Sequence, residues 1–172
     1  MRWADVVALR QSTREFTAKM PARDAIGRIV RAGRMAPISM HRNASYTIAV
    51  VTEADTIDAW RTEFRAKVKD TDPFYGAPLL FVVAGAAEIE PEMRAADAAC
   101  IVDHMLLAAT AEGLGSVFIC GAVRALGATA DYIARLHLPA GMVPIAAAAV
   151  GHAATALMPR EVSDIGTNWP DA

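Results

Sequence analysis

The strongest constraint in this sequence is a long stretch, residues 91–112, that is apolar or small on nearly every side of a helix. It begins at Pro91, a residue that suits the start of a helix, and it ends at a Gly-Leu-Gly stop at residues 113–115. A surface helix normally shows a single apolar stripe, so a helix without a clear polar face is buried on more than one side. We therefore expect a fold in which this helix lies deep within the protein.

Helical and strand-like patterns alternate along the rest of the chain. Apolar residues recur at helical spacing in some segments, and runs rich in β-branched residues indicate strands in others. Residues 36–43 are predicted to form a loop, because Pro37 disfavours helix at the residue before it. We expect one α+β domain over residues 1–172, with a sheet that carries helices on both faces. The predicted helices are 3–9, 21–35, 54–69, 91–112 and 124–136, and the predicted strands are 46–52, 79–85, 116–119 and 144–151.

The composition is apolar enough for a sizeable core, with 54% hydrophobic and 21% charged residues among 172. Much of the excess is alanine, as in the run 146–149, so we expect close packing of small side chains. A chain of this size and apolar content can also bury surface between subunits. A well-buried monomer and a subunit of a larger assembly both remain open on this evidence.

Several classes of protein are disfavoured by charge and patterning. The net charge of −2 and the scattered lysines and arginines give no footprint for nucleic acid. The longest apolar stretches, 77–87 and 142–150, are shorter than the roughly 20 residues of a membrane span, and the N-terminus lacks a signal-peptide pattern. We expect a cytoplasmic protein. The four histidines show no metal-ligand spacing, and Cys100 and Cys120 are predicted to be free thiols in the core.

A dense group of hydrogen-bond donors follows the first predicted helix, at Arg10, Gln11, Ser12, Thr13 and Arg14. The planar guanidinium group makes paired, charge-assisted hydrogen bonds to phosphate, and each such bond contributes about 1.5–3 kcal/mol. Taken alone, the same residues are also compatible with a solvated turn. The sequence therefore suggests a candidate phosphate site without deciding between these two interpretations.

A second candidate motif, GLGSVFICG, lies at residues 113–121 and contains three glycines. A dinucleotide fingerprint needs its glycines after a strand and before a helix, whereas these follow a helix and precede a strand. What remains is the pair Cys120 and Gly121 at the end of a predicted strand, where backbone N–H groups can face a ligand. Asp97 and Asp103 are expected to be surface charges, and we predict no catalytic nucleophile, acid or base among the side chains.

The order of several short motifs is more specific than any one of them. The motifs are RQSTREF at 10–16, APISMHRN at 36–43 followed by YTIAVV at 46–51, FYGAPLLFVV at 74–83, DAACIVDHMLLAATAEGLGSVFICG at 97–121, LHLPAGMVPIAAAAVGHA at 136–153 and MPRE at 158–161. Together they resemble, in the same order, the motifs of the nitroreductase family of flavoproteins.

The resemblance implies an intertwined homodimer, in which each subunit has a central mixed, mostly antiparallel sheet flanked by helices. It also implies an FMN bound in the dimer interface with contacts from both subunits. Family positions that hold the phosphate and ribityl oxygens match Arg10, Ser12 and Arg14, with Gln11 between them as a further cofactor-binding residue. Arg160 matches the C-terminal arginine that closes on the phosphate.

The resemblance assigns further residues to the flavin ring. The loop that packs against the isoalloxazine from the partner subunit matches Pro37, Ile38 and Ser39, although Ile38 stands where the family often has serine. The pair whose backbone approaches the N5 edge of the flavin matches Cys120 and Gly121. For a donor at the pyrimidine edge of the ring we expect Arg14, with Arg65 or Lys67 as helpers.

The activity implied by the resemblance is transfer of electrons from NAD(P)H to a nitroaromatic, quinone or similar small organic acceptor by a ping-pong cycle. Relatives on the same scaffold reductively dehalogenate, oxidise azoline rings or fragment the flavin, so these chemistries are alternatives. A flavin-binding or flavin-handling protein with little turnover is another. A domain without any cofactor is the remaining alternative. The sequence does not choose the nicotinamide or the acceptor.

Overall fold

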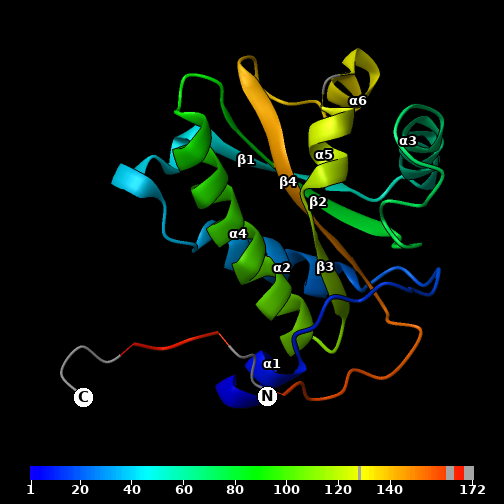
Figure 1. The fold of residues 1–172 in the computed structure, drawn as a ribbon, viewed down its shortest axis with the longest axis vertical. Coiled ribbons are helices and arrows are strands. Elements are labelled where there is room, and N and C mark those ends of the chain that lie inside the picture. The colour runs from blue at the N-terminus through cyan, green and yellow to red at the C-terminus, as the bar shows by residue number, and fades with distance from the viewer. Residues whose placement is uncertain (128, 162–164, 169–172) are drawn as a thin grey trace.

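The computed structural model describes residues 1–127, 129–161 and 165–168 of the chain. Helices and strands follow one another much as the sequence predicts, and four strands form one open sheet (Figure 1). The helices are α1 (Trp3–Leu9), α2 (Arg23–Arg34), α3 (Ala54–Lys67), α4 (Pro91–Ala111), α5 (Gly121–Leu126) and α6 (Ala130–Arg135), with short 3-10 turns at Ser39–His41 and Asn43–Ser45. The strands are β1 (Tyr46–Val51), β2 (Leu79–Ala86), β3 (Gly115–Ile119) and β4 (Met142–Gly151).

The strands lie in the order β1-β2-β4-β3, and every pair of neighbouring strands is antiparallel. The mixed sheet implied by the resemblance is therefore wrong for these four strands. Within the described residues the parallel contact is an isolated bridge between Ser12 and Ser116, outside the named strands. This order leaves β3 at one edge of the sheet, with the segment after α1 beside it.

The central strands are buried on both faces, and their side chains alternate between two apolar layers. Leu79, Phe81 and Val83 of β2 pack toward α2 and α4, while Leu80 and Val82 pack toward α3, α5 and α6. All eight residues of β2 are buried, as expected for a strand covered on both sides. The view in Figure 1 shows α2 and α4 over one part of the sheet and α3, α5 and α6 grouped together elsewhere.

The long apolar helix is α4, and it is buried as the sequence predicts on a broad face. Ala98, Val102, Met105 and Ala109 are fully covered by α2 and the sheet. The helix ends at Ala111, and Gly113 shortly after it has a φ of +72°, a conformation that glycine adopts readily. Its C-terminal carbonyls are satisfied there, because the Leu114 N–H donates to the Ala109 carbonyl at 2.9 Å.

The predicted helix over 124–136 is wrong in its extent. The structure has two shorter helices, α5 and α6, in its place, and residue 128 lies outside the described residues. The Thr129 hydroxyl donates to the Leu126 carbonyl at 2.8 Å, and Thr129 has an extended backbone conformation that starts a new helix. Apolar spacing that looks continuous in the sequence therefore belongs to two helices that both face the core.

Gly115 has a packing reason that the sequence does not reveal. A Cβ atom at this position would lie 2.7 Å from Thr13 Oγ1 and 3.0 Å from Ala153 Cβ. Because real Cβ contacts do not approach so closely, glycine is what allows the segment after α1 to lie against the start of β3.

We expect Gly115→Ala to lower the free energy of unfolding by about 1–3 kcal/mol, because overpacking would push Thr13 away from β3. Urea denaturation of the variant measures this. The control is Gly27→Ala on α2, where a Cβ atom meets nothing within 4 Å and should stabilise the helix by about 0.5–1 kcal/mol. Equal unfolding midpoints for the wild type and Gly115→Ala would contradict the packing described here.

Candidate functional site

The segment that follows α1 is fixed along one end of the sheet by backbone hydrogen bonds. The Thr13 N–H donates to the Ser116 carbonyl at 2.9 Å, and the Thr17 N–H donates to the His152 carbonyl at 2.9 Å. The Ala154 N–H in turn donates to the Glu15 carbonyl at 3.0 Å. These bonds hold the polar side chains of residues 10–14 next to the start of β3 and the end of β4.

The chain after β4 returns to the same place. The Arg160 N–H donates to the Ala8 carbonyl at 2.9 Å, and the Gln11 amide Nε2 donates to the Met158 carbonyl at 3.2 Å. Arg160 therefore lies beside α1 and Arg10, although these arginines are 150 positions apart in the sequence. Five predicted phosphate-site residues are brought into one region by this arrangement, namely Arg10, Gln11, Ser12, Arg14 and Arg160.

The electrostatics of this region are those of a cationic site. Partial burial lowers the pKa of the Arg10 guanidinium, the positive charge of Arg160 lowers it further, and Asp103 on α4 opposes both effects. Among the described residues, the guanidinium groups of Arg10, Arg14 and Arg160 form no ion pair with a carboxylate within 4 Å. Two converging cations repel one another unless an anion lies between them. The donors present here match a phosphate group.

A shallow pocket of about 260 Å³ lies behind this segment, between residues 11–15 and 153–157. Thr13 lines this pocket, and its Oγ1 is buried without a hydrogen-bond partner among the described residues, as is the Oγ of Ser116 on the neighbouring strand β3. Buried hydroxyl groups are usually paired, so unpaired ones beside a cationic segment are consistent with a polar ligand or bound water at this place.

The other end of β3 forms a second part of the candidate site. Cys120 and Gly121 follow the last residue of the strand and line a groove of about 390 Å³. Phe118, on the edge strand, is 38% exposed and lines the same groove. Ser116 and Cys120 are four residues apart on an extended strand, which places the cationic segment and this groove about 13 Å apart.

Both cysteines are free thiols, as predicted. Each is half-buried rather than fully buried, so the prediction that they lie in the core is only partly right. Cys120 directly follows an edge strand rather than a central one, which leaves it only half-buried.

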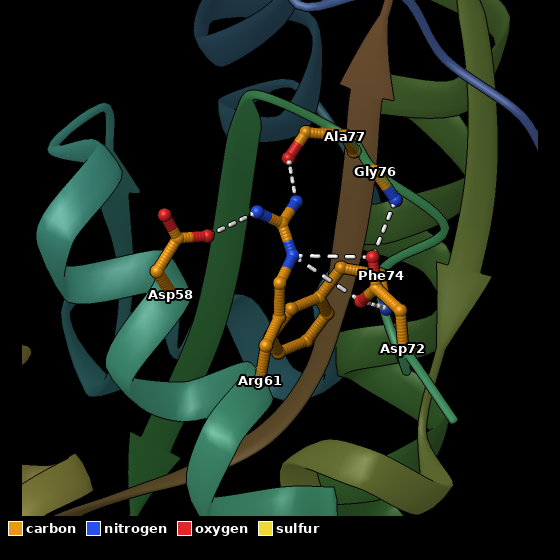
Figure 2. Close-up of polar contacts among 6 residues, drawn as sticks. All are labelled: Asp58, Arg61, Asp72, Phe74, Gly76 and Ala77. Carbon is orange, nitrogen blue, oxygen red and sulfur yellow. Dashed lines mark hydrogen bonds and ion pairs between the residues drawn. The ribbon is translucent and has the colours of Figure 1, made fainter. Parts of the chain in front are cut away.

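The opposite wall of the groove is the turn at residues 72–77, which is held by Arg61 of α3 (Figure 2). The Asp72 carboxylate accepts hydrogen bonds from the Phe74 N–H at 2.8 Å and the Gly76 N–H at 2.7 Å. The Arg61 Nε lies 3.2 Å from the same carboxylate, and its Nη2 donates to the Ala77 carbonyl at 2.8 Å. Asp58 accepts the remaining hydrogen bond from Arg61 Nη1 at 2.6 Å.

A lysine that the sequence motifs do not single out, Lys69, lines this groove. Lys69 lies there beside Thr71 and Tyr75, whereas neither of the expected helpers, Arg65 and Lys67, lines it. The Lys67 ammonium is instead paired with Glu63 at 2.7 Å on the surface of α3. The sequence carried a weak signal for Lys69, because it stands where the helix was expected to end and a turn to begin.

The loop with Pro37, Ile38 and Ser39 is attached to the N-terminal half of α4 through Asp97. Both donors of Ser39 bind Asp97 Oδ1, the backbone N–H at 3.1 Å and the hydroxyl at 2.7 Å. The Tyr46 hydroxyl donates to Asp97 Oδ2 at 2.8 Å. The prediction that Asp97 is a surface charge is wrong, since it is only 4% exposed, whereas Asp103 is exposed as expected.

Within one chain this loop does not join the cationic segment. Figure 1 shows residues 37–43 in cyan at the left of α4, while residues 10–20 lie in blue at the lower right. Among the described residues, no hydrogen bond, ion pair or pocket connects Ser39 with Arg10 or Arg14. The predicted site residues therefore form two separate groups in the structure of a single subunit.

An open antiparallel sheet with helices on both faces and a cationic segment across its end defines an α+β protein with a candidate site for a small anionic ligand. The model of the Nitroreductase family matches residues 7–152. This chain belongs to the nitroreductase family, and the resemblance noted in its motifs is confirmed. Arg160 lies beyond the matched residues, so its assignment rests on the geometry described above.

Solved structures share this fold over nearly the whole chain. A nitroreductase with bound FMN from Bacteroides fragilis is 21% identical, with a TM-score of 0.86 and 98% of each chain covered. A nitroreductase with bound FMN from Desulfitobacterium hafniense is 24% identical, with a TM-score of 0.84 and 95% of each chain covered. A putative NADH oxidase from Clostridium acetobutylicum is 21% identical, with a TM-score of 0.72, covering 93% of this chain and 95% of that one.

No curated protein sequence matches the chain. Within the described ranges, none of the helices combines the length and apolar character that crossing a bilayer requires.

We expect Arg61→Met to lower the free energy of unfolding by about 2 kcal/mol, because Asp72 and the Ala77 carbonyl lose a charged partner in a largely buried place. Arg65→Met, four residues later on the exposed surface of α3, is the matched control and should change stability by less than about 0.5 kcal/mol. Chemical denaturation of both variants makes the comparison. If the two substitutions cost the same, Arg61 does not hold the turn.

Proposed function

We propose that this chain is an FMN-dependent oxidoreductase that passes electrons from NAD(P)H to a small organic acceptor such as a nitroaromatic compound or a quinone. The observation that carries the proposal is the convergence of Arg10 and Arg160 beside Ser12, without a carboxylate partner among the described residues. A dianionic phosphate between these groups would relieve their repulsion. The family and the FMN named for two of the similar structures support the choice of this ligand.

The residues present fit FMN in their chemistry. Arg10 and Arg160 would hold the phosphate, while Gln11, Ser12 and Arg14 supply donors for the phosphate and the ribityl oxygens. Bound FMN supplies the redox chemistry, so the chain itself needs no acid, base or nucleophile. The backbone N–H groups at Cys120 and Gly121 would face the ring at the far end of β3.

Charge near the pyrimidine edge of the ring is the second task of the chain. A cation there stabilises negative charge that develops on reduction, because a fixed donor in a partly dry site costs little reorganisation. Arg14 is our first candidate for this role. Lys69, which lines the groove beside Cys120, replaces Arg65 and Lys67 as the second candidate.

We propose that the active form is an intertwined homodimer. Large apolar side chains are exposed next to each of the two groups of site residues: Trp3, Val7 and Met158 near the arginines, and Met35 and Met40 near the loop. In an isologous dimer, the first patch of one copy contacts the second patch of the other, and the reverse contact follows by symmetry. Pro37, Ile38 and Ser39 would then reach the flavin held by the partner.

The substrates would use one open face of this site in turn, which gives a ping-pong cycle. NAD(P)H would bind first and leave, and the acceptor would then occupy the same place. The alternative within the same fold is a flavin-binding or flavin-handling protein with little turnover, or a relative with another flavin chemistry.

The double variant Arg10→Ala/Arg160→Ala should remain folded and lose FMN, with an affinity at least about 100-fold weaker than that of the wild type, because several charge-assisted hydrogen bonds disappear. Flavin absorbance of the purified protein and titration with added FMN measure this. Arg31→Ala/Arg135→Ala removes two exposed arginines that are not among the residues assigned to FMN and should retain the flavin. Full flavin occupancy in the first variant would show that the phosphate is bound elsewhere.

Addition of NADH or NADPH to the purified yellow protein under anaerobic conditions should bleach the flavin absorbance, and addition of a quinone or nitroaromatic compound should restore it. Stopped-flow absorbance separates the two half-reactions. A protein that binds FMN but is bleached by neither nucleotide would favour the alternative of a flavin-handling protein. A colourless monomer that takes up no added FMN would exclude both.

A further inference from the structure

Asp97 of α4 is a buried carboxylate that accepts three hydrogen bonds. The Ser39 N–H and the Ser39 hydroxyl both donate to Oδ1, at 3.1 and 2.7 Å, and the Tyr46 hydroxyl donates to Oδ2 at 2.8 Å. Ser39 is 58 positions and Tyr46 is 51 positions away from Asp97 in the sequence. A buried charge is costly unless it is well satisfied, so three donors on one carboxylate indicate a dedicated arrangement.

The charged form of Asp97 is the one that this arrangement favours. Burial disfavours ionisation, but the hydrogen bonds from Ser39 and Tyr46 and the positive charge of Arg42 outweigh it and lower the pKa of Asp97. Burial and the hydrogen bond to Asp97 raise the pKa of Tyr46, which therefore keeps its proton. An ionised carboxylate has no hydrogen to donate, so the direction of all three hydrogen bonds is fixed.

This direction restricts what Ser39 can offer to anything else. A serine normally presents one hydroxyl donor and two acceptor lone pairs, together with a backbone N–H. Here the hydroxyl hydrogen and the N–H are both used by Asp97, so Ser39 retains acceptor capacity alone. Ser39 itself is only half-buried, so part of this residue lies at the surface of the chain.

We propose that Asp97 is a positioning residue that turns Ser39 into a hydrogen-bond acceptor for an N–H group of the bound flavin ring. This inference rests on the proposed function, in which the loop with Ser39 meets the flavin of the partner. The oxidised isoalloxazine ring carries its N–H at N3, between two carbonyl groups that are acceptors. An acceptor-only serine distinguishes that N–H from the carbonyl groups beside it, and so selects one placement of the pyrimidine edge.

The experiment compares FMN with N3-methyl-FMN, which lacks this donor, by titrating each into apoprotein and following flavin fluorescence. The wild type should bind FMN about tenfold more tightly than the methylated flavin, as expected for the loss of one hydrogen bond. Ser39→Ala should bring this ratio close to one. Ser45→Ala, a nearby serine without a side-chain hydrogen bond among the described residues, should leave the ratio unchanged.

The Asp97→Asn variant keeps the size of the side chain but changes its hydrogen bonding, because an amide can both donate and accept. We expect the ratio to fall in this variant, and we expect Asp97→Asn to add nothing in the Ser39→Ala background. Where Asp97→Asn fails to fold, as judged by circular dichroism, Ser39→Ala alone decides the question. A role of Asp97 in stability alone would change the unfolding midpoint without changing the ratio.

Equal affinity of the wild type for the two flavins would overturn this inference and leave the proposed function intact. An unchanged ratio in Ser39→Ala would overturn it as well. Failure of the wild type to bind FMN at all would instead remove the proposed function, and this inference with it.

Discussion

The arrangement of the whole molecule depends on the small side chains of β4. Ala146 and Ala148 face α2 and α4, while Ala147 and Ala149 face α3, α5 and α6, and all four are buried. Protein interiors pack as densely as organic crystals, so a strand of alanines allows helices on both faces to approach the sheet closely. The close approach of α4 brings Asp97 to the loop with Ser39 and Asp103 toward Arg10. Larger residues in β4 would separate these layers.

The two parts of the candidate site differ in charge, because one holds arginines and the other is built around a buried carboxylate. The ends of the chain bring arginines together at one end of the sheet, where an anion would relieve their repulsion. At the loop with Ser39, the negative charge of Asp97 is satisfied internally and imposes an acceptor character on its neighbours. The two parts lie apart in one subunit, and this separation is the reason that we consider the complete site to need two copies of the chain.

Some residues could be interpreted from the sequence and others could not, and the difference has a physical cause. Motifs such as residues 10–14 and 113–121 are local and can be recognised in the sequence, and the structure brings Arg160 beside Arg10. Asp97 was expected on the surface because its partners, Ser39 and Tyr46, are remote in the sequence. The helix over 124–136 was predicted as one because α5 and α6 both turn apolar residues toward the same layer. Lys69 was overlooked because only the folded turn at 72–77 places it in a groove.

Hydrophobic periodicity and short motifs are local properties of the chain, and they are sufficient to predict most of the helices and strands, the burial of α4 and the family. The folded chain is needed to establish that the sheet is antiparallel in the order β1-β2-β4-β3, that Arg160 lies beside Arg10, and that Asp97 is buried beneath Ser39. Each of these depends on contacts between residues far apart in the chain. Such contacts are selected by the packing of whole layers, which no single segment of the sequence encodes.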